Sequence, residues 1–355
     1  MSGERGEADR PRPEALLEVR DLRTHFFLDH GVVRAVDGVN LRVEPGKTLG
    51  IVGESGCGKS ITARSIIRTV EPPGRIVDGQ ILLRRRAGRG DGRAPSEVVD
   101  LARLPPRGRE IRAIRGREIA MIFQEPMTSL SPHYTIGNQI GESLVLHLGV
   151  GKREARERTI DLLRQVGMAR PELRVDDYPH RLSGGMRQRA MIAMAIACGP
   201  SLLIADEPTT ALDVTTQAQI LELLKDMQRR LGMAVIIITH DLGVIAETAD
   251  DVAVMYLGSV VETAAVDAIF HDPKHPYTRA LLRSIPTVGL ETRQRLDSIA
   301  GMVPDPFHRP TGCTFHPRCP AFMDGVCDRR VPPTVWLGAG RDVSCLLYPD
   351  RAASA

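Results

Sequence analysis

The sequence predicts an α/β fold built on a largely parallel sheet, in a chain of 355 residues. Three observations lead to this prediction. Short apolar runs of strand length alternate with longer runs that have helical periodicity, one apolar run leads into a glycine-rich loop, and another ends in two carboxylates. Strands that alternate with helices typically form parallel sheets joined by right-handed crossovers.

The individual elements follow from periodicity and from their end signals. The expected strands are 16–19, 31–43, 48–52, 119–123, 202–206, 234–239 and 252–256. The expected helices are 59–69, 151–166, 186–198 and 215–231. The last is the clearest, because its apolar residues recur on one side and Gly232 follows it as a stop signal. These apolar residues are Ile220, Leu223, Leu224, Met227 and Leu231.

Composition bounds the organisation of the chain. No apolar run approaches the roughly 20 residues of a membrane-spanning helix. Residues 1–14 mix charges with Gly and Pro and lack the apolar core of a signal peptide, so we expect a disordered start and a cytosolic protein. Residues 15–266 are expected to form one domain. From about residue 267 the sequence becomes rich in proline and holds four of the six cysteines, which predicts a separate extension over 267–355.

Charge is concentrated in one stretch. Residues 84–117 carry eleven arginines and four acidic residues, a net of +7, which leaves −4 for the rest of the chain. Its glycines and prolines indicate a loop rather than a folded module. The favoured interpretation is a solvated insertion, and contact with anionic lipid headgroups is the alternative.

The segment after the expected strand 48–52 is a candidate phosphate-binding loop. It reads Gly53-Glu54-Ser55-Gly56-Cys57-Gly58-Lys59-Ser60. Backbone N–H groups in such a loop hold a polyphosphate, and glycines let the backbone approach it. Lys59 is expected to reach the β- and γ-phosphates, and the Ser60 hydroxyl to bind Mg²⁺. Cys57 is interpreted as contributing only its backbone. The loop predicts a site for ATP and Mg²⁺ in a P-loop NTPase.

Four further residues are expected at the same site. Asp206 ends an apolar strand and is expected to hold Mg²⁺, while Glu207 is placed to polarise the attacking water. His240 follows a neighbouring strand and is expected to bond the γ-phosphate. Gln124 follows the strand 119–123, and its amide is expected to reach Mg²⁺ and the water. The alternatives are a helix cap or loop role for either acid, a structural histidine, and a surface glutamine.

A third motif points to a family. Ser183 can cap a helix whose N-terminus is left bare for an anion by Gly184 and Gly185. Lying about 125 residues after the glycine loop and about 20 before the acidic strand, this segment resembles the signature of ATP-binding cassette (ABC) proteins. Gln124 then matches their Q-loop and His240 their switch histidine, and the segment Ala211-Leu212-Asp213 matches their D-loop. The resemblance covers about residues 16–263.

The resemblance implies a RecA-like core with an antiparallel β subdomain and a helical subdomain at about 135–189. It also implies that two cassettes sandwich two nucleotides, with Ser183, Gly184 and Gly185 contacting the γ-phosphate bound to the partner. The adenine-stacking aromatic of the family corresponds to Phe26 or Phe27, although the turn at 28–31 shifts the register.

Three shorter segments narrow the resemblance to oligopeptide and dipeptide permease ATPases, in particular the D-type subunit. They are residues 123–130, Met186 after the signature glycines, and His275-Pro276-Tyr277-Thr278. This implies a peptide importer with two membrane permeases, an extracytoplasmic binding protein and usually a second, different ATPase, at the cytoplasmic face of the inner membrane. Import of nickel, glutathione or another small solute is one alternative. A soluble ABC ATPase acting on ribosomes or DNA is the other, but the chain has neither a second cassette nor a long coiled coil, so no nucleic-acid partner is expected.

The cysteines of the extension form a separate pattern. Cys313, Cys319, Cys327 and Cys345 are not expected to form disulfides in a reducing cytosol. No pair has the close spacing of zinc sites, and irregular spacing with a following proline fits an iron–sulfur cluster better. Several D-type permease ATPases carry such a cluster, so the resemblance implies a structural [4Fe–4S] site. Zinc and free thiols remain alternatives.

Overall fold

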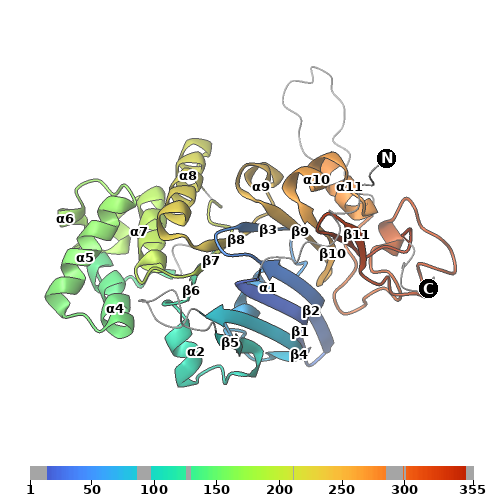
Figure 1. Cartoon of the computed structure of the whole chain (residues 1–355), viewed down its shortest axis with the longest axis horizontal. Helices are drawn as coiled ribbons and strands as arrows, with labels where there is room; N and C mark the ends of the chain where they lie inside the picture. Colours follow the sequence, from blue (N-terminus) through green and yellow to red (C-terminus); the bar gives the residue numbers. More distant parts are fainter. Residues whose placement is uncertain are drawn as a thin grey trace, which may run out of the picture. The chain divides into compact units, whose positions relative to one another are not determined.

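The computed structural model describes residues 14–85, 97–124, 129–210, 212–284, 299 and 301–348 (Figure 1). The chain divides into two compact units. Unit 1 comprises Met1–Glu44, Leu49–Ala102 and His240–Ala355, and unit 2 comprises Pro45–Thr48 and Arg103–Thr239. The C-terminal extension is therefore part of the same unit as the glycine loop.

One sheet of unit 1 is antiparallel and has the strand order β2-β1-β4-β5. Its strands are β1 (Leu17–Leu28), β2 (Gly31–Val43), β4 (Gly74–Arg85) and β5 (Glu97–Asp100). Leu17 pairs with Val43 on one side and with Leu83 on the other, and all three side chains are buried. This sheet is the antiparallel β subdomain that the family resemblance implied.

The other strands of unit 1 carry the glycine loop and the extension. The strand β3 (Thr48–Val52) pairs in parallel with β9 (Asp251–Tyr256), and β10 (Ser259–Ala265) continues antiparallel to β9. The extension adds β12 (Arg341–Val343) on β10 and then β11 (Val335–Gly338). The helices of this unit are α1 (Lys59–Ile66), α9 (Leu242–Thr248), α10 (Val266–His271) and α11 (Pro276–Arg283).

Helix α9 packs tightly on the strand that leads to the loop. A Cβ added at Gly50 of β3 would lie 2.7 Å from Cδ1 of Ile245, which is fully buried in α9. The strands β3 and β9 are buried along almost their whole length. This two-sided burial explains why they appear in the sequence as continuous apolar runs rather than as alternating ones.

Unit 2 contains a parallel sheet of β6 (Ile119–Ile122), β7 (Leu202–Asp206) and β8 (Ala234–Ile238). Met121 pairs with Ile204, which pairs with Ile236. The long helix α8 (Val214–Leu231) buries Ile220, Leu221, Leu224 and Met227 and ends at Gly232, whose φ is 62°. Leu231, expected on the buried side, is 42% exposed because it lies in the last turn.

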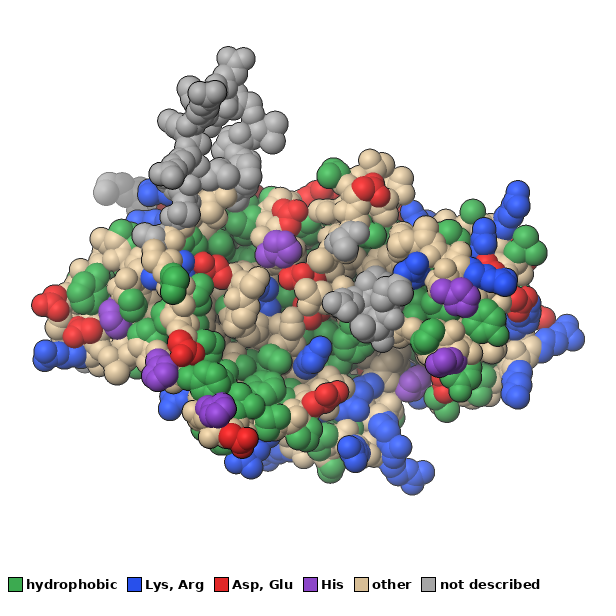
Figure 2. Space-filling model, turned by 180° about the vertical axis from the view of Figure 1, so that it is seen from behind, with side chains coloured by type: hydrophobic (Ala, Val, Ile, Leu, Met, Phe, Trp, Pro, Cys, Tyr) green, Lys and Arg blue, Asp and Glu red, His purple; other side chains and the backbone are tan. Residues whose placement is uncertain are grey.

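The remaining helices of unit 2 are α4 (Ile136–Leu148), α5 (Lys152–Gln165), α6 (Pro171–Arg174) and α7 (Gly184–Ile196). Apolar residues such as Ile140, Leu144 and Leu163 are fully buried among them. Their outer surface carries interspersed charges of both signs (Figure 2), including the ion pair of Arg156 with Asp176. These helices occupy the range expected for the helical subdomain.

The arginine-rich stretch is not simply a loop, so that expectation was wrong for its described part. Val99 in β5 pairs with Leu83, and a helix α2 (Arg109–Ile114) buries Ile111 and Ile114. Spaced apolar residues thus form elements despite the many arginines. Residues 86–96 lie outside the described part of the chain. Among the described residues, no helix combines the length and apolar character needed to cross a membrane.

Candidate nucleotide site

The glycine loop of unit 1 joins β3 to α1, as its motif requires. Glycine is needed at both ends of the loop because the backbone has no room for a side chain there. A Cβ would lie 2.2 Å from the Met255 carbonyl oxygen at Gly53 and 2.2 Å from the Ala35 carbonyl oxygen at Gly58. Both glycines also have positive φ, 150° and 101°. A larger residue at either position would distort the glycine loop.

Lys59 is buried at the start of α1, with 6% of its surface exposed. Its Nζ donates hydrogen bonds to the carbonyl oxygens of Gly53 at 2.7 Å and of Glu54 at 3.1 Å. The ammonium group is therefore held against the loop that it is expected to complete. Ser60, predicted to bind Mg²⁺, is half-buried in the first turn of the same helix.

Cys57 is buried inside the loop, and burial raises the pKa of its thiol. Its carbonyl oxygen accepts a hydrogen bond from the Gly258 N–H at 2.9 Å. Ser55 and Gly56, the other predicted members of the loop, are exposed at its tip. That the middle of the loop contributes only its backbone to a ligand stays a prediction.

The two candidate adenine-stacking aromatics lie near the end of β1. A Cβ at Gly74 would lie 2.6 Å from the Phe26 ring, so this ring packs inside unit 1. Phe27 is 39% exposed, and the guanidinium carbon of Arg75 lies 4.2 Å from its ring centroid. One face of Phe27 is thus covered by a cation, and its role in adenine stacking stays a prediction.

His240 also belongs to unit 1 and is exposed immediately before α9. The following residue, Asp241, is the N-cap of that helix, and its Oδ1 accepts a hydrogen bond from the Gly243 N–H at 2.8 Å. The cap fixes the start of α9, so the backbone next to His240 is held in place.

The predicted catalytic carboxylate lies in unit 2, directly after β7. Glu207 Oε2 accepts hydrogen bonds from Gln124 Nε2 at 2.8 Å and from Thr210 Oγ1 at 2.9 Å. The Glu207 N–H donates to the Ile238 carbonyl oxygen at 2.8 Å. The structure thus brings together two of the residues predicted from separate motifs, Gln124 and Glu207.

The backbone at Glu207 is strained, with a φ of 49° in a residue other than glycine. Such conformations cost on the order of 1–3 kcal/mol and are common at functional sites. Asp206, one residue earlier, is only 3% exposed at the end of β7. Neither acid caps a helix, because α8 begins at Val214 with Asp213 as its N-cap.

The predicted signature segment opens α7 in unit 2. Ser183 is its N-cap and accepts a hydrogen bond from the Met186 N–H at 3.4 Å. The helix is expected over 186–198 but begins two residues earlier, because Gly184 and Gly185 already have helical conformation. A Cβ at Gly185 would lie 3.0 Å from Thr216 Cγ2, so the start of α8 limits the size of the residue there.

Two further hydrogen-bonded residues lie beside the predicted motifs of unit 2, Gln188 and Asp213. The buried Gln188 of α7 donates from Nε2 to the Pro208 carbonyl oxygen at 2.6 Å, directly after Glu207. Asp213, predicted to belong to the D-loop, accepts from the Thr216 N–H at 2.9 Å and from its hydroxyl at 2.7 Å. These bonds hold the pKa of Asp213 below its ordinary value. Ala211, the other end of that loop, lies outside the described residues.

The Mg²⁺ donors expected from the sequence are the Ser60 hydroxyl, the Gln124 amide and the Asp206 carboxylate. Oxygen ligands of this kind suit Mg²⁺, which usually keeps several waters and binds nucleotide phosphates. Each of these oxygen donors is therefore of a type that suits the ion. Ser60 lies in unit 1, and Gln124 and Asp206 lie in unit 2.

The predicted iron–sulfur site is not formed in the described structure. Across the residues described, no group of three or more His, Cys, Asp or Glu side chains is arranged to hold a metal ion. All four thiols are free. Burial, together with the other three thiols, raises the pKa of Cys313 to about 11, and burial likewise raises the pKa of Cys319 and Cys345. The other three thiols thus lie within electrostatic reach of Cys313 without forming a ligand set.

Two residues that contact the glycine loop were not predicted from the motifs. The Tyr277 hydroxyl accepts a hydrogen bond from the Glu54 N–H at 3.0 Å, and Arg318 forms an ion pair with the Glu54 carboxylate at 2.7 Å. Tyr277 is part of the His-Pro-Tyr-Thr segment that suggested the narrower family, and this was the one signal available for it. Arg318 is one arginine among many in the sequence.

Three features together define a nucleoside triphosphatase of the cassette type. They are a glycine loop at a strand–helix junction, a buried strand ending in two carboxylates, and a serine-capped helix. The family description "ABC transporter" matches residues 36–210, and "Oligopeptide/dipeptide transporter, C-terminal region" matches residues 261–327. The chain belongs to the ABC transporter family as an ATP-binding ATPase chain.

Relatives match over nearly the full length. The oligopeptide transport ATP-binding protein AppD of Bacillus subtilis is 50% identical over 95% of this chain and 98% of its own length. The dipeptide transport ATP-binding protein DppD of Escherichia coli is 48% identical over 95% of this chain and 98% of its own length. A solved cassette dimer bound to ADP and phosphate is 25% identical, with a TM-score of 0.60 over 70% of this chain and 98% of that one. These likenesses confirm the predicted fold.

Proposed function

We propose that this chain is the ATP-hydrolysing subunit that energises an ABC importer of dipeptides or oligopeptides. The observation that carries the proposal is the match of residues 261–327 to the oligopeptide/dipeptide transporter C-terminal region. Support also comes from the names of relatives that span both this region and the cassette, among them an oligopeptide and a dipeptide transport ATP-binding protein.

In the proposed mechanism, the glycine loop binds the triphosphate through backbone N–H groups, and Lys59 moves from its loop carbonyls to the terminal phosphates. Glu207 polarises the attacking water, oriented by the Gln124 amide, and His240 bonds the γ-phosphate. Mg²⁺ would be held by Ser60, Gln124 and Asp206 and would neutralise phosphate charge. The Gln124–Glu207 hydrogen bond supports this assignment because it fixes the carboxylate at the end of β7.

Hydrolysis in this scheme needs two cassettes. Ser183, Gly184 and Gly185 contact the γ-phosphate held by a partner cassette, a second and different ATPase subunit, and Asp213 lies in the loop between the two. The two cassettes close when ATP binds and reopen after hydrolysis, and this motion drives transport. The bare N-terminus of α7 supports this role, because the cap leaves backbone N–H groups available to an anion.

The membrane partners are two permease subunits, with an extracytoplasmic binding protein acting through them, and the chain sits at the cytoplasmic face of the inner membrane. Gln124 and the helical subdomain at about 135–189 transmit closure to the permeases. Exposed apolar side chains in unit 2 support a protein-binding surface there: Phe123 is 39% exposed, Tyr134 59% and Leu146 71%.

A [4Fe–4S] cluster on Cys313, Cys319, Cys327 and Cys345 is the finer cofactor proposal. Its support is the presence of four partly or fully buried thiols within one extension, three of them close enough to the fourth, Cys313, to help raise its pKa. Cluster assembly would have to draw the sulfurs together. Anaerobic purification tests this proposal: four irons per chain and visible absorbance support it, and a colourless, iron-free protein that hydrolyses ATP contradicts it.

The function is tested by reconstituting the chain with its permeases, its partner ATPase and its binding protein in vesicles. ATP turnover that rises with dipeptides or oligopeptides, and not with nickel or glutathione, supports the proposal. If only nickel or glutathione stimulates turnover, the chain still energises an importer, but the transported substrate is that solute rather than a peptide. Co-purification with ribosomes or DNA instead of membranes would contradict import altogether.

A further inference from the structure

Glu54, the second residue of the glycine loop, is held from three directions. Its N–H donates to the Tyr277 hydroxyl at 3.0 Å, and its carbonyl oxygen accepts from Lys59 Nζ at 3.1 Å. Its carboxylate accepts from Arg318 in a bidentate pair, with Nη1 to Oε2 at 2.7 Å and Nη2 to Oε1 at 3.0 Å. Two of these three partners, Tyr277 and Arg318, come from the C-terminal extension.

The Arg318 side chain is only 3% exposed, so the pair is shielded from solvent on the arginine side. The hydrogen bonds that Arg318 donates to Glu54 are the main reason that the pKa of Arg318 is raised, and the guanidinium stays protonated. Arg318 also donates to the Tyr256 hydroxyl at 3.4 Å. Bidentate arginine–carboxylate pairs are among the strongest side-chain interactions and also fix the orientation of both groups.

An aromatic cluster holds both of these partners in place. Phe315, 1% exposed, packs edge-on against Tyr256 with ring centroids 5.2 Å apart and against Tyr277 at 5.3 Å. The Tyr256 and Tyr277 rings are 4.7 Å apart. Because Phe315 lies three residues before Arg318, its burial places the arginine next to the loop.

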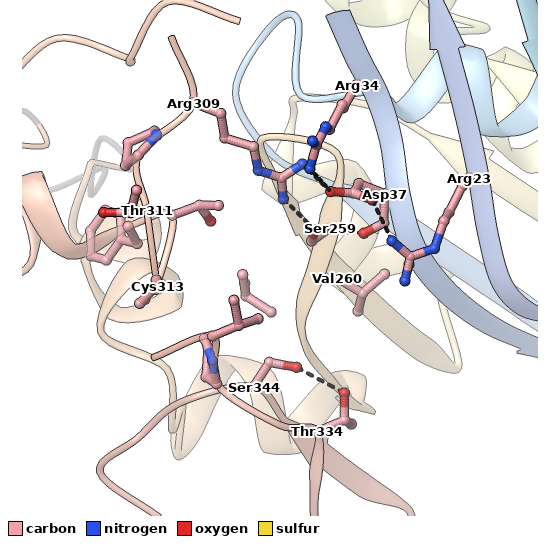
Figure 3. Close-up of a pocket in the computed structure, with 18 of the residues that line it drawn as sticks. Arg23, Arg34, Asp37, Ser259, Val260, Arg309, Thr311, Cys313, Thr334 and Ser344 are labelled. Atoms are coloured by element: carbon pink, nitrogen blue, oxygen red, sulfur yellow. Dashed lines mark hydrogen bonds and ion pairs between the residues drawn. The ribbon is translucent and has the colours of Figure 1, made fainter. Parts of the chain in front are cut away.

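A second arginine anchors the same segment of the extension. Figure 3 shows Arg309 reaching Asp37 of β2 and Ser259 of β10, with distances of 2.7 Å to Asp37 Oδ2 and 2.9 Å to Ser259 Oγ. These contacts line a cavity of about 850 Å³. The Asp37 N–H donates to the Gly258 carbonyl oxygen, and the Gly258 N–H donates to the Cys57 carbonyl oxygen of the loop. The extension is therefore fixed to strands that themselves contact the loop.

The contacts of Arg318 and Tyr277 with Glu54, here called the brace, matter because of the chemistry of the loop. A carboxylate in a loop that holds a triphosphate repels the ligand unless its charge is neutralised and its side chain is turned aside. Arg318 does both for Glu54, and Tyr277 satisfies the Glu54 N–H. We infer that Arg318 and Tyr277 are positioning residues of the nucleotide site, which make the ATP affinity of the glycine loop depend on the C-terminal extension.

The test is the KM for ATP and the kcat of Arg318→Gln in the assembled transporter. The variant leaves Glu54 charged and unpaired, so we expect the KM to rise about tenfold, with kcat within about twofold of wild type. In the double variant Glu54→Gln/Arg318→Gln the repelling charge is gone, and the KM is expected to return to within about threefold of wild type, because removing both partners costs less than removing one.

Arg341→Gln is the matched control. It removes another arginine of the extension, which pairs with Asp272 at 3.0 Å rather than with a residue of the loop, and its KM for ATP should equal that of wild type. An unchanged KM in Arg318→Gln, or a double variant as impaired as the single one, overturns the inference. The latter outcome would leave Arg318 with a folding role only, which thermal unfolding of the variants would also show.

Tyr277→Phe keeps the aromatic packing and removes only the hydroxyl, so it tests the brace even where Arg318→Gln does not assemble. We expect its KM for ATP to rise about threefold, because the Glu54 N–H loses its acceptor. An unchanged KM in Tyr277→Phe, together with failure of Arg318→Gln to fold, also overturns the inference. The inference rests on ATP use by this chain, and a wild-type complex that hydrolyses no ATP would refute that function rather than the brace.

Discussion

Gln124 and Glu207 are 83 residues apart in the sequence, and the Gln124 amide donates a 2.8 Å hydrogen bond to the Glu207 carboxylate. Thr210 donates to the same oxygen at 2.9 Å. The carboxylate that we propose as the activator of water is thus oriented by an amide from the end of β6 and a hydroxyl from its own loop. A displacement of the end of β6 would therefore move a hydrogen-bond donor of the Glu207 carboxylate.

Gln124→Ala should lower kcat about ten- to a hundredfold, because a hydrogen bond to a charged group is worth about 1.5–3 kcal/mol. The KM for ATP should change little, since the glycine loop remains intact. Steady-state ATP turnover of the assembled transporter measures both constants. Gln219→Ala is the control, because this glutamine contacts Arg189 instead. Equal kcat values for the two variants would contradict the role of Gln124.

Glu207→Gln should retain ATP binding and lose at least about a hundredfold in kcat, since the amide is a poor acceptor for the proton of water. The variant should also trap the closed pair of cassettes with ATP bound, which size exclusion with labelled ATP would detect. Glu222→Gln, on the exposed side of α8, supplies the comparison. Turnover like that of wild type in Glu207→Gln would refute the assignment.

Lys59→Ala should weaken ATP binding at least about tenfold, because a charge-assisted contact with the phosphates is lost. Equilibrium binding of labelled ATP to the full chain measures this effect. Lys152→Ala, at the exposed start of α5, should bind as wild type does. Since Lys59 also holds the Gly53 and Glu54 carbonyls, thermal unfolding should be recorded for both variants, and unimpaired binding by Lys59→Ala would contradict the site.

Ser183→Ala should reduce turnover of the assembled pair more than Thr135→Ala does. Both residues are helix N-caps, with cap hydrogen bonds of 3.4 Å and 3.2 Å, so both substitutions should cost about 0.5–2 kcal/mol of stability. Only Ser183 is proposed to contact the partner's nucleotide. Matching stability losses with a larger drop in ATP turnover for Ser183→Ala are expected, and equal turnover of the two variants would count against the shared site.

Stability should fall as the pH drops below about 6.5, partly through His275. Burial lowers the pKa of His275 from 6.5 to about 3, and its Nδ1 accepts from the Tyr277 N–H at 3.0 Å. Between these two values the unfolded chain binds a proton that the folded chain does not, so folding weakens by up to about 1.4 kcal/mol per pH unit. Denaturant unfolding from pH 8 to 4.5 measures the slope.

His275→Asn is the comparison for this slope, because asparagine keeps a cap acceptor but does not titrate in this range. Its unfolding free energy should depend less steeply on pH than that of wild type. Parallel curves for the two proteins would show that other groups account for the acid sensitivity.

Much of the fold could be predicted because its elements have strong local signals. The buried strands β3, β7 and β8 are continuous apolar runs, and α8 has a clear amphipathic period with a glycine stop. β10, β11 and β12 had no such signal, because they are short and mix polar with apolar residues. Their pairing depends on partners far along the chain.

The residues of the candidate site also differ in how far the sequence could predict them. Glycine loops and acid-ended strands indicate their chemistry through spacing, so Lys59, Asp206 and Glu207 could be proposed as site residues from the sequence. The partners of those residues could not. Arg318 reaches Glu54 across 264 positions, and tertiary contacts such as the buried aromatic cluster bring them together. The cysteine spacing suggested a cluster that the described geometry does not form, because spacing along a chain does not fix distances between sulfurs.

In the described part of the chain, specific charge pairs add to aromatic packing where the extension meets the rest of unit 1. An extension transplanted onto an unrelated cassette would carry two guanidinium groups, the part-buried Arg309 and the buried Arg318, into a host without matching carboxylates. A working chimaera would therefore need Glu54 and Asp37 along with residues 309–318, so the extension and its own cassette would have to be exchanged together.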